Sequence, residues 1–155
     1  MNNIQNTVVM TKEGLDELKR EHNELLNIKR PDVVDRLAAA RSQGDLAENS
    51  EYTAARQDLA FIDGRISELE RVIAEAKVVS VHSKSKIDVG CKVTLHVGGK
   101  KEMFVIVGEW EADPKEKKIS HSSPLGKALL GKKIGEIAEV EAPVGKVVYK
   151  ILAIE

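Results

Sequence analysis

Two acidic side chains, Asp45 and Glu48, lie in segment 41–52, between two long stretches with helical patterns. Carboxylate oxygens are ligands that Mg²⁺ prefers, but two carboxylates are too few to hold the ion alone. At the end of a stiff helical rod, such a pair would have to complete a metal site that begins on another molecule. The residue types in this segment allow that chemistry.

The same two acids also have a purely structural explanation. Gly44 suits the left-handed residue that follows a helix, and Asp45 is a good N-cap for the next helix. Glu48 stands three residues later, where a capping box places its acid. From the residues alone, capping explains both acids more simply than metal chemistry does, and both interpretations stay open.

Apolar spacing predicts that segment 41–52 is the turn of a helical hairpin. Residues 1–9 are expected to be a short tail, after which Thr11 can cap the first helix. Pro31 should kink or break that helix after Arg30. The apolar positions of the first arm follow a coiled-coil seam: Leu15, Leu18, His22, Leu25, Val33, Leu37 and Ala40.

The second arm repeats at alternating intervals of three and four without a gap: Tyr52, Ala55, Leu59, Ile62, Ile66, Leu69, Ile73 and Ala76. These patterns predict an antiparallel coiled coil with arms of roughly 30 residues and a length of roughly 45 Å. Basic residues near the turn form a phosphate-binding face or pair with local acids, and both interpretations stay open: Lys29, Arg30, Arg36, Arg41 and Arg56.

Charge and composition divide the 155-residue chain near residue 80. Residues 1–80 hold 11 Lys and Arg against 15 Asp and Glu, whereas residues 81–155 hold 13, all Lys, against 10. The low aromatic content of 3% argues against a base-stacking surface, and the single Cys91 excludes a disulfide framework. The chain has no signal-peptide pattern and no apolar run of membrane-spanning length, so a cytoplasmic protein is expected.

The second half predicts a sheet with one helix packed on it, which makes the whole chain α+β. The expected strands cover 89–97, 103–107, 137–140 and 147–154. Between them, Ser122 or Ser123 caps a short helix, with Pro124 in its first turn and Gly131 after its end. The scattered histidines and serines form no catalytic motif.

Several motifs together resemble the bacterial Gre transcript-cleavage factors. The tip sequence runs from Gly44 to Tyr52 and continues with Ala54-Ala55-Arg56, and the second half carries Ser123-Pro124-Leu125-Gly126-Lys127. The likeness spans the chain from Met10 to its end. It implies a coiled-coil hairpin domain over 1–80, with an acidic tip at 44–51, and an FKBP-like domain over 81–155 that docks on a polymerase.

The resemblance implies a factor that binds bacterial RNA polymerase and inserts its coiled coil through the secondary channel. It then stimulates the polymerase's own cleavage of backtracked RNA. Carried over by position, Asp45 and Glu48 are the tip acids that complete a Mg²⁺ site shared with the polymerase, and the chain has no cofactor of its own. Candidate contacts with the RNA 3′ end, other nucleic acid of the transcription complex or the polymerase are Arg41, Asn49, Arg56, Ser123 and Pro124.

Three other functions stay open. A Gre-like protein without cleavage activity would plug the channel and inhibit the polymerase. An enzyme in its own right, either a nuclease or a prolyl isomerase, would need more metal ligands or an aromatic pocket. A coiled-coil scaffold would give the tip acids no role. A monomer is expected because the hairpin satisfies its own seam.

Overall fold

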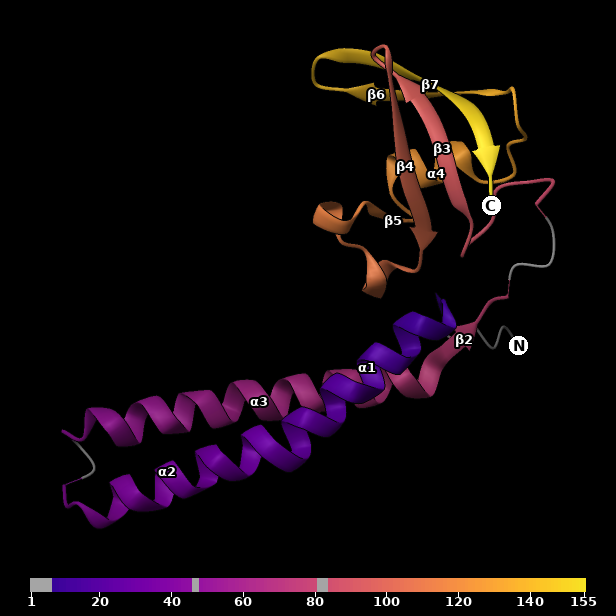
Figure 1. Ribbon diagram of the computed structural model, residues 1–155. Helices are drawn as coiled ribbons and strands as arrows, with labels where there is room; N and C mark the ends of the chain where they lie inside the picture. The colour runs from indigo at the N-terminus through magenta and orange to yellow at the C-terminus, as the bar shows by residue number, and fades with distance from the viewer. Residues whose placement is uncertain (1–6, 46–47, 81–83) are drawn as a thin grey trace, which may run out of the picture. The chain divides into compact units, whose positions relative to one another are not determined.

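The computed structural model describes residues 7–45, 48–80 and 84–155 (Figure 1). The fold is α+β, with a long helical hairpin and a sheet domain carrying a short helix. The chain packs as two compact units, Asp16–Glu75 and Met1–Leu15 with Ala76–Glu155. The start of the expected tail, the middle of the expected tip and part of the expected linker near residue 80 lie outside the described residues.

The first arm of the hairpin is helical throughout. It consists of α1 (Lys12–Glu24), a π-helical stretch η1 (Leu25–Lys29) and α2 (Arg30–Ser42). The second arm is the single helix α3 (Ser50–Glu75), which packs along α2 (Figure 1). Most buried apolar residues follow the predicted seam: Leu18, Leu25, Val33 and Ala40 on the first arm, and Ala55, Ile62, Ile66 and Leu69 on the second. Near the end of α3 the prediction is wrong, because Val72 is fully buried and the predicted Ile73 is only half-buried.

The π-helical stretch accommodates one extra residue in the seam. The buried residues of the first arm are seven apart except between Leu25 and Val33, which are eight apart. The Arg30 N–H donates to the Leu25 carbonyl, five residues back, so the seam keeps facing α3 across the insertion. Pro31, which has no N–H to donate, follows directly, and the chain stays helical rather than breaking after Arg30.

A short parallel strand pair joins the two ends of the hairpin. Strand β1 (Val8–Met10) pairs with β2 (Ala76–Val78), and the Val79 N–H donates to the Met10 carbonyl at 3.0 Å. The expectation that residues 1–9 form only a tail is therefore wrong for this segment. Ala76 also leaves the predicted helical seam to enter β2.

The sheet domain is a five-stranded mixed sheet in the order β5-β4-β3-β7-β6. Its strands are β3 (Lys92–Val97), β4 (Lys100–Val107), β5 (Lys118–Ser120), β6 (Ile137–Ala142) and β7 (Gly145–Ile154). Only the β4–β5 pairing is parallel. The short helix α4 (Pro124–Leu129) places Leu129 in the core against Leu95, Ile106 and Ile151.

Glu111 attaches the start of α1 to the sheet domain. It belongs to a 3-10 turn, η2 (Glu109–Glu111), and its carboxylate accepts the Thr11 and Gly108 N–H groups at 2.9 Å and also the Thr11 hydroxyl. Thr11 in turn caps α1 as predicted, because its Oγ1 accepts the Gly14 N–H at 3.1 Å. A Cβ at Gly14 would clash with the Glu111 carboxylate, so this packing requires glycine there.

Replacing Glu111 by Ala should lower the free energy of unfolding of the sheet domain by about 1–3 kcal/mol, because two backbone N–H groups and a hydroxyl lose a charged acceptor. The measurement is urea unfolding followed by the fluorescence of Trp110, the only tryptophan of the chain. Glu116→Ala is the control, since Glu116 is exposed and only pairs with Lys118 at the surface. Equal losses in the two variants would contradict the role given to Glu111.

Candidate functional site

The candidate site is the loop that joins α2 to α3. The first arm ends at Ser42, and Gly44 has a φ of +123°, which confirms that this position favours glycine. Asp45 and Glu48 both lie in the loop, outside the two helices, and both are exposed. The loop therefore presents two carboxylates at the end of the hairpin where the chain passes from α2 to α3.

Asn49, not Asp45, caps α3. The helix begins at Ser50, and the Asn49 Oδ1 accepts the Tyr52 N–H at 3.1 Å. The predicted N-cap at Asp45 and the capping box with Glu48 are therefore wrong, because α3 begins only at Ser50. Asparagine caps helices as well as aspartate does. The residue types at 45 and 49 alone did not distinguish them.

The side chain of Asn49 also reaches the opposite arm. The Asn49 Nδ2 donates to the Ala40 carbonyl at 2.7 Å, and the Asn49 backbone carbonyl accepts the Thr53 N–H at 3.1 Å. Ala40 and Ala55 are 3% and 1% exposed, so two small side chains pack where the arms meet behind the loop. The loop is thus closed by a direct polar link between the end of α2 and the start of α3.

Two of the predicted contact residues flank the loop. The Arg41 guanidinium lies over the Tyr52 ring, 5.8 Å from its centroid, which joins the arms through a cation–π contact. Arg56 is exposed one turn further along α3 and lines a shallow pocket with Tyr52, Thr53 and Gln57. Tyr52 was predicted only as a seam residue, and its contact with Arg41 needed the pairing of the arms to be seen.

Arg30 and Arg36, two further residues of the predicted basic face, pair with acids. Arg30 donates to Asp63 at 2.7 Å, and Arg36 donates to Asp58 at 3.0 Å. The hydrogen bond and the charge of Asp63 raise the pKa of Arg30 above its ordinary value. For these residues the structure favours local pairing over a free phosphate-binding face, so the basic groups nearest the loop are Arg41 and Arg56.

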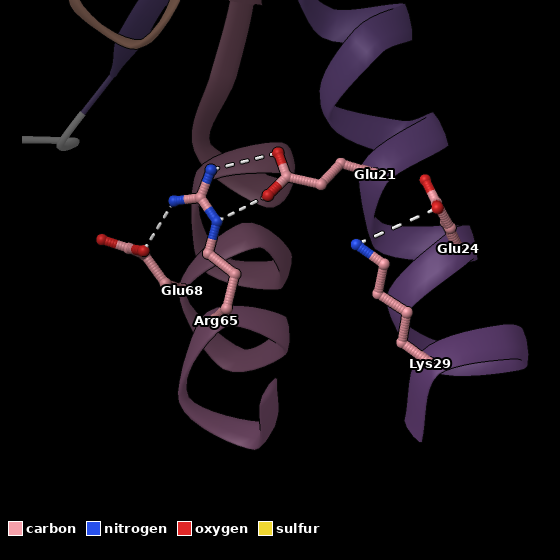
Figure 2. Close-up of polar contacts among 5 residues, drawn as sticks. All are labelled: Glu21, Glu24, Lys29, Arg65 and Glu68. Atoms are coloured by element: carbon pink, nitrogen blue, oxygen red, sulfur yellow. Dashed lines mark hydrogen bonds and ion pairs between the residues drawn. The ribbon is translucent and has the colours of Figure 1, made fainter. Parts of the chain in front are cut away.

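A further link between the arms is built on Arg65 (Figure 2). Its Nε and Nη2 donate to the two carboxylate oxygens of Glu21 on the other arm, at 2.8 and 3.1 Å, and Nη1 donates to Glu68 at 2.8 Å. The hydrogen bonds to Glu21 are the largest cause of a raised pKa at Arg65, although partial burial opposes it. Figure 2 also shows the looser pair Lys29–Glu24 at 4.0 Å, within the first arm.

Ser123 and Pro124 have a structural role in the sheet domain. Ser123 is the N-cap of α4, with its Oγ accepting the Gly126 N–H at 3.0 Å and donating to the Ser120 carbonyl at 2.7 Å. Pro124 is the first residue of the helix and is exposed. The predicted cap is confirmed, and contact with a polymerase stays a prediction.

Asp45 and Glu48 could hold a metal ion only together with further ligands. Within 7–45, 48–80 and 84–155, no three side chains of His, Cys, Asp or Glu lie close enough together to hold one. Asp45 and Glu48 are the hard oxygen donors that Mg²⁺ takes, but they supply only part of its coordination. No helix in the described part of the chain is long and apolar enough to cross a membrane.

Two family models match the chain, and both describe transcription elongation factors. Residues 8–78 match the N-terminal model of transcription elongation factor GreA/GreB, and residues 82–155 match the GreA/GreB C-terminal model. The chain is 46% identical to transcription elongation factor GreA of Lactococcus lactis subsp. cremoris, with 98% of this chain and 100% of that one covered. It is 44% identical to GreA of Thermoanaerobacter pseudethanolicus, with 95% and 96% covered.

Among solved structures, that of GreA factor homolog 1 of Thermus thermophilus is 29% identical, with 96% of this chain and 99% of that chain covered and a TM-score of 0.45.

Replacing Arg65 by Lys should destabilise the hairpin by about 1 kcal/mol, because a lysine cannot donate to both oxygens of Glu21 and to Glu68 in the same planar geometry. Urea unfolding followed by far-ultraviolet circular dichroism measures this loss. Arg36→Lys serves as the matched control and should cost only a few tenths of a kcal/mol, since its pair with Asp58 is more than half exposed. If both variants lose the same free energy of unfolding, the Arg65–Glu21 contact stabilises the hairpin no more than an exposed ion pair does.

Proposed function

The chain belongs to the GreA/GreB family of transcription elongation factors, and from this premise we propose that its hairpin tip acts inside the active site of RNA polymerase. As a member of this family it stimulates transcript cleavage by RNA polymerase and is not itself the catalyst. The proposal assigns the action to Asp45 and Glu48. It also assigns the route, which is the secondary channel of the polymerase.

The supporting observation is that helix capping does not use the two acids. Asn49 provides the cap of α3, so Asp45 and Glu48 are not required for that structural role. Both side chains are exposed in the loop at the end of a two-helix rod. This exposed placement suits contact with another molecule.

Asp45 and Glu48 would hold a Mg²⁺ ion together with carboxylates of the polymerase. When bound, such an ion lowers the pKa of a coordinated water and so favours hydrolysis of the RNA phosphodiester. The part played by this chain is to bring two anionic ligands to the site and to hold them in place. Arg41 and Arg56, on either side of the loop, would neutralise phosphates of the extruded RNA 3′ end.

The remaining parts of the chain would deliver the tip. The hairpin is only two helices wide along α2 and α3, which suits entry into a narrow channel. The sheet domain would dock on the polymerase rim, with Ser123 and Pro124 as candidate contacts. We place the protein in the bacterial cytoplasm as a monomer.

The test is cleavage of labelled RNA in a backtracked complex of bacterial RNA polymerase with Mg²⁺. Asp45→Asn together with Glu48→Gln should lower the cleavage rate by about 100-fold or more, because two metal ligands lose their charge. Competition with labelled unmodified protein measures polymerase binding in parallel, and we expect it to be unchanged. Asp35→Asn, an exposed acid on α2, makes the same kind of charge change away from the tip and should retain cleavage.

Two outcomes would contradict the proposal. If the unmodified protein binds the complex without stimulating cleavage, it is a channel-blocking inhibitor. If the double variant cleaves normally, or loses cleavage only in proportion to lost binding, the acids are not metal ligands.

A further inference from the structure

Both polar atoms of the Asn49 side-chain amide form hydrogen bonds with the backbone. Its Oδ1 accepts the Tyr52 N–H at 3.1 Å, and its Nδ2 donates to the Ala40 carbonyl at 2.7 Å. The amide orientation is consistent, since the oxygen faces a donor and the nitrogen faces an acceptor. The first bond begins α3, and the second crosses to the end of α2.

The cross-arm bond depends on how closely the arms approach each other. Ala40 and Ala55 are almost fully buried, and their small side chains let a short amide reach the opposite backbone. The Ala40 carbonyl belongs to the last turn of α2, and it also accepts the Gln43 N–H at 3.2 Å. Asn49 supplies a second donor to that carbonyl, while its Oδ1 accepts an N–H from the first turn of α3, which has no partner within the helix.

We propose that Asn49 is a positioning residue for the tip acids. It directly follows Glu48, and its two bonds fix the separation of the chain segments from which the loop with Asp45 and Glu48 emerges. Because the loop is already ordered in the folded protein, metal binding does not carry the entropic cost of ordering it. This inference rests on the proposed metal role of the acids and replaces the expectation that Asn49 contacts RNA or polymerase.

Asn49→Ser separates the two bonds. Serine is an equally good N-cap, so the bond to the Tyr52 N–H and the start of α3 should be kept. Its side chain is too short to reach the Ala40 carbonyl, so only the cross-arm bond is lost. Asn27→Ser is the matched control, because Asn27 is an exposed asparagine of the same hairpin whose amide donates within its own arm, to Asn23.

The first readout uses the free protein without metal or polymerase. In ¹⁵N-labelled protein, the backbone order parameters of Asp45 and Glu48 should fall in Asn49→Ser, while those at the centre of α3 stay at the values of a rigid helix. Asn27→Ser should change neither. Unchanged order parameters at both acids in Asn49→Ser would overturn the proposal.

The second readout is the Mg²⁺ dependence of RNA cleavage in backtracked complexes. Asn49→Ser should need about five-fold more Mg²⁺ for half-maximal cleavage, the factor that corresponds to one lost hydrogen bond. The concentration of protein needed for half-maximal effect should not change. If that concentration rises and the Mg²⁺ dependence does not, Asn49 is a contact with polymerase or RNA, and the proposal is wrong.

The acid variants separate this inference from the proposed function. If Asp45→Asn and Glu48→Gln leave cleavage intact, the metal role fails whatever Asn49 does. If the acid variants lose cleavage while Asn49→Ser matches the unmodified protein in Mg²⁺ dependence, only the positioning role fails.

Discussion

The hairpin has only one narrow apolar interface to hold two long helices together. A helix in a layered domain can bury a broad face, but in this unit each arm has only the other to pack on, so a single line of buried residues carries the packing. Hydrogen bonds and ion pairs between the arms therefore contribute more to the stability of the hairpin. Arg30–Asp63, Arg36–Asp58 and Arg65–Glu21 occur at intervals along this line, and Asn49 closes its end.

The same constraint explains the π-helical stretch. One extra residue between Leu25 and Val33 would rotate the rest of the first arm and turn its apolar residues away from α3. A local change in hydrogen bonding costs less than the loss of that half of the seam. Ala40 then still faces the second arm, where it allows the close approach on which the Asn49 bond depends.

The apolar periodicity of the sequence was enough to predict both arms, the turn between them and the short helix capped by Ser123. It missed β1 and β2, because three-residue strands whose partners are more than 60 residues apart leave no local pattern. The sequence pattern also missed β5, because this strand has only three residues. At the tip, the sequence predicted the cap at Asp45, and only the geometry of the closed loop shows that Asn49 caps α3 instead.

An incomplete metal site is a means of control as well as a structural consequence. Two carboxylates on an exposed loop bind Mg²⁺ weakly, so under the proposed function the free protein has no hydrolytic activity that could damage RNA. Activity arises only where a second set of carboxylates lies within reach, which confines it to the polymerase active site. The hairpin must then hold the acids in an exposed loop. A neutral amide at position 49 meets this requirement, because it caps α3 and donates a hydrogen bond to the end of α2.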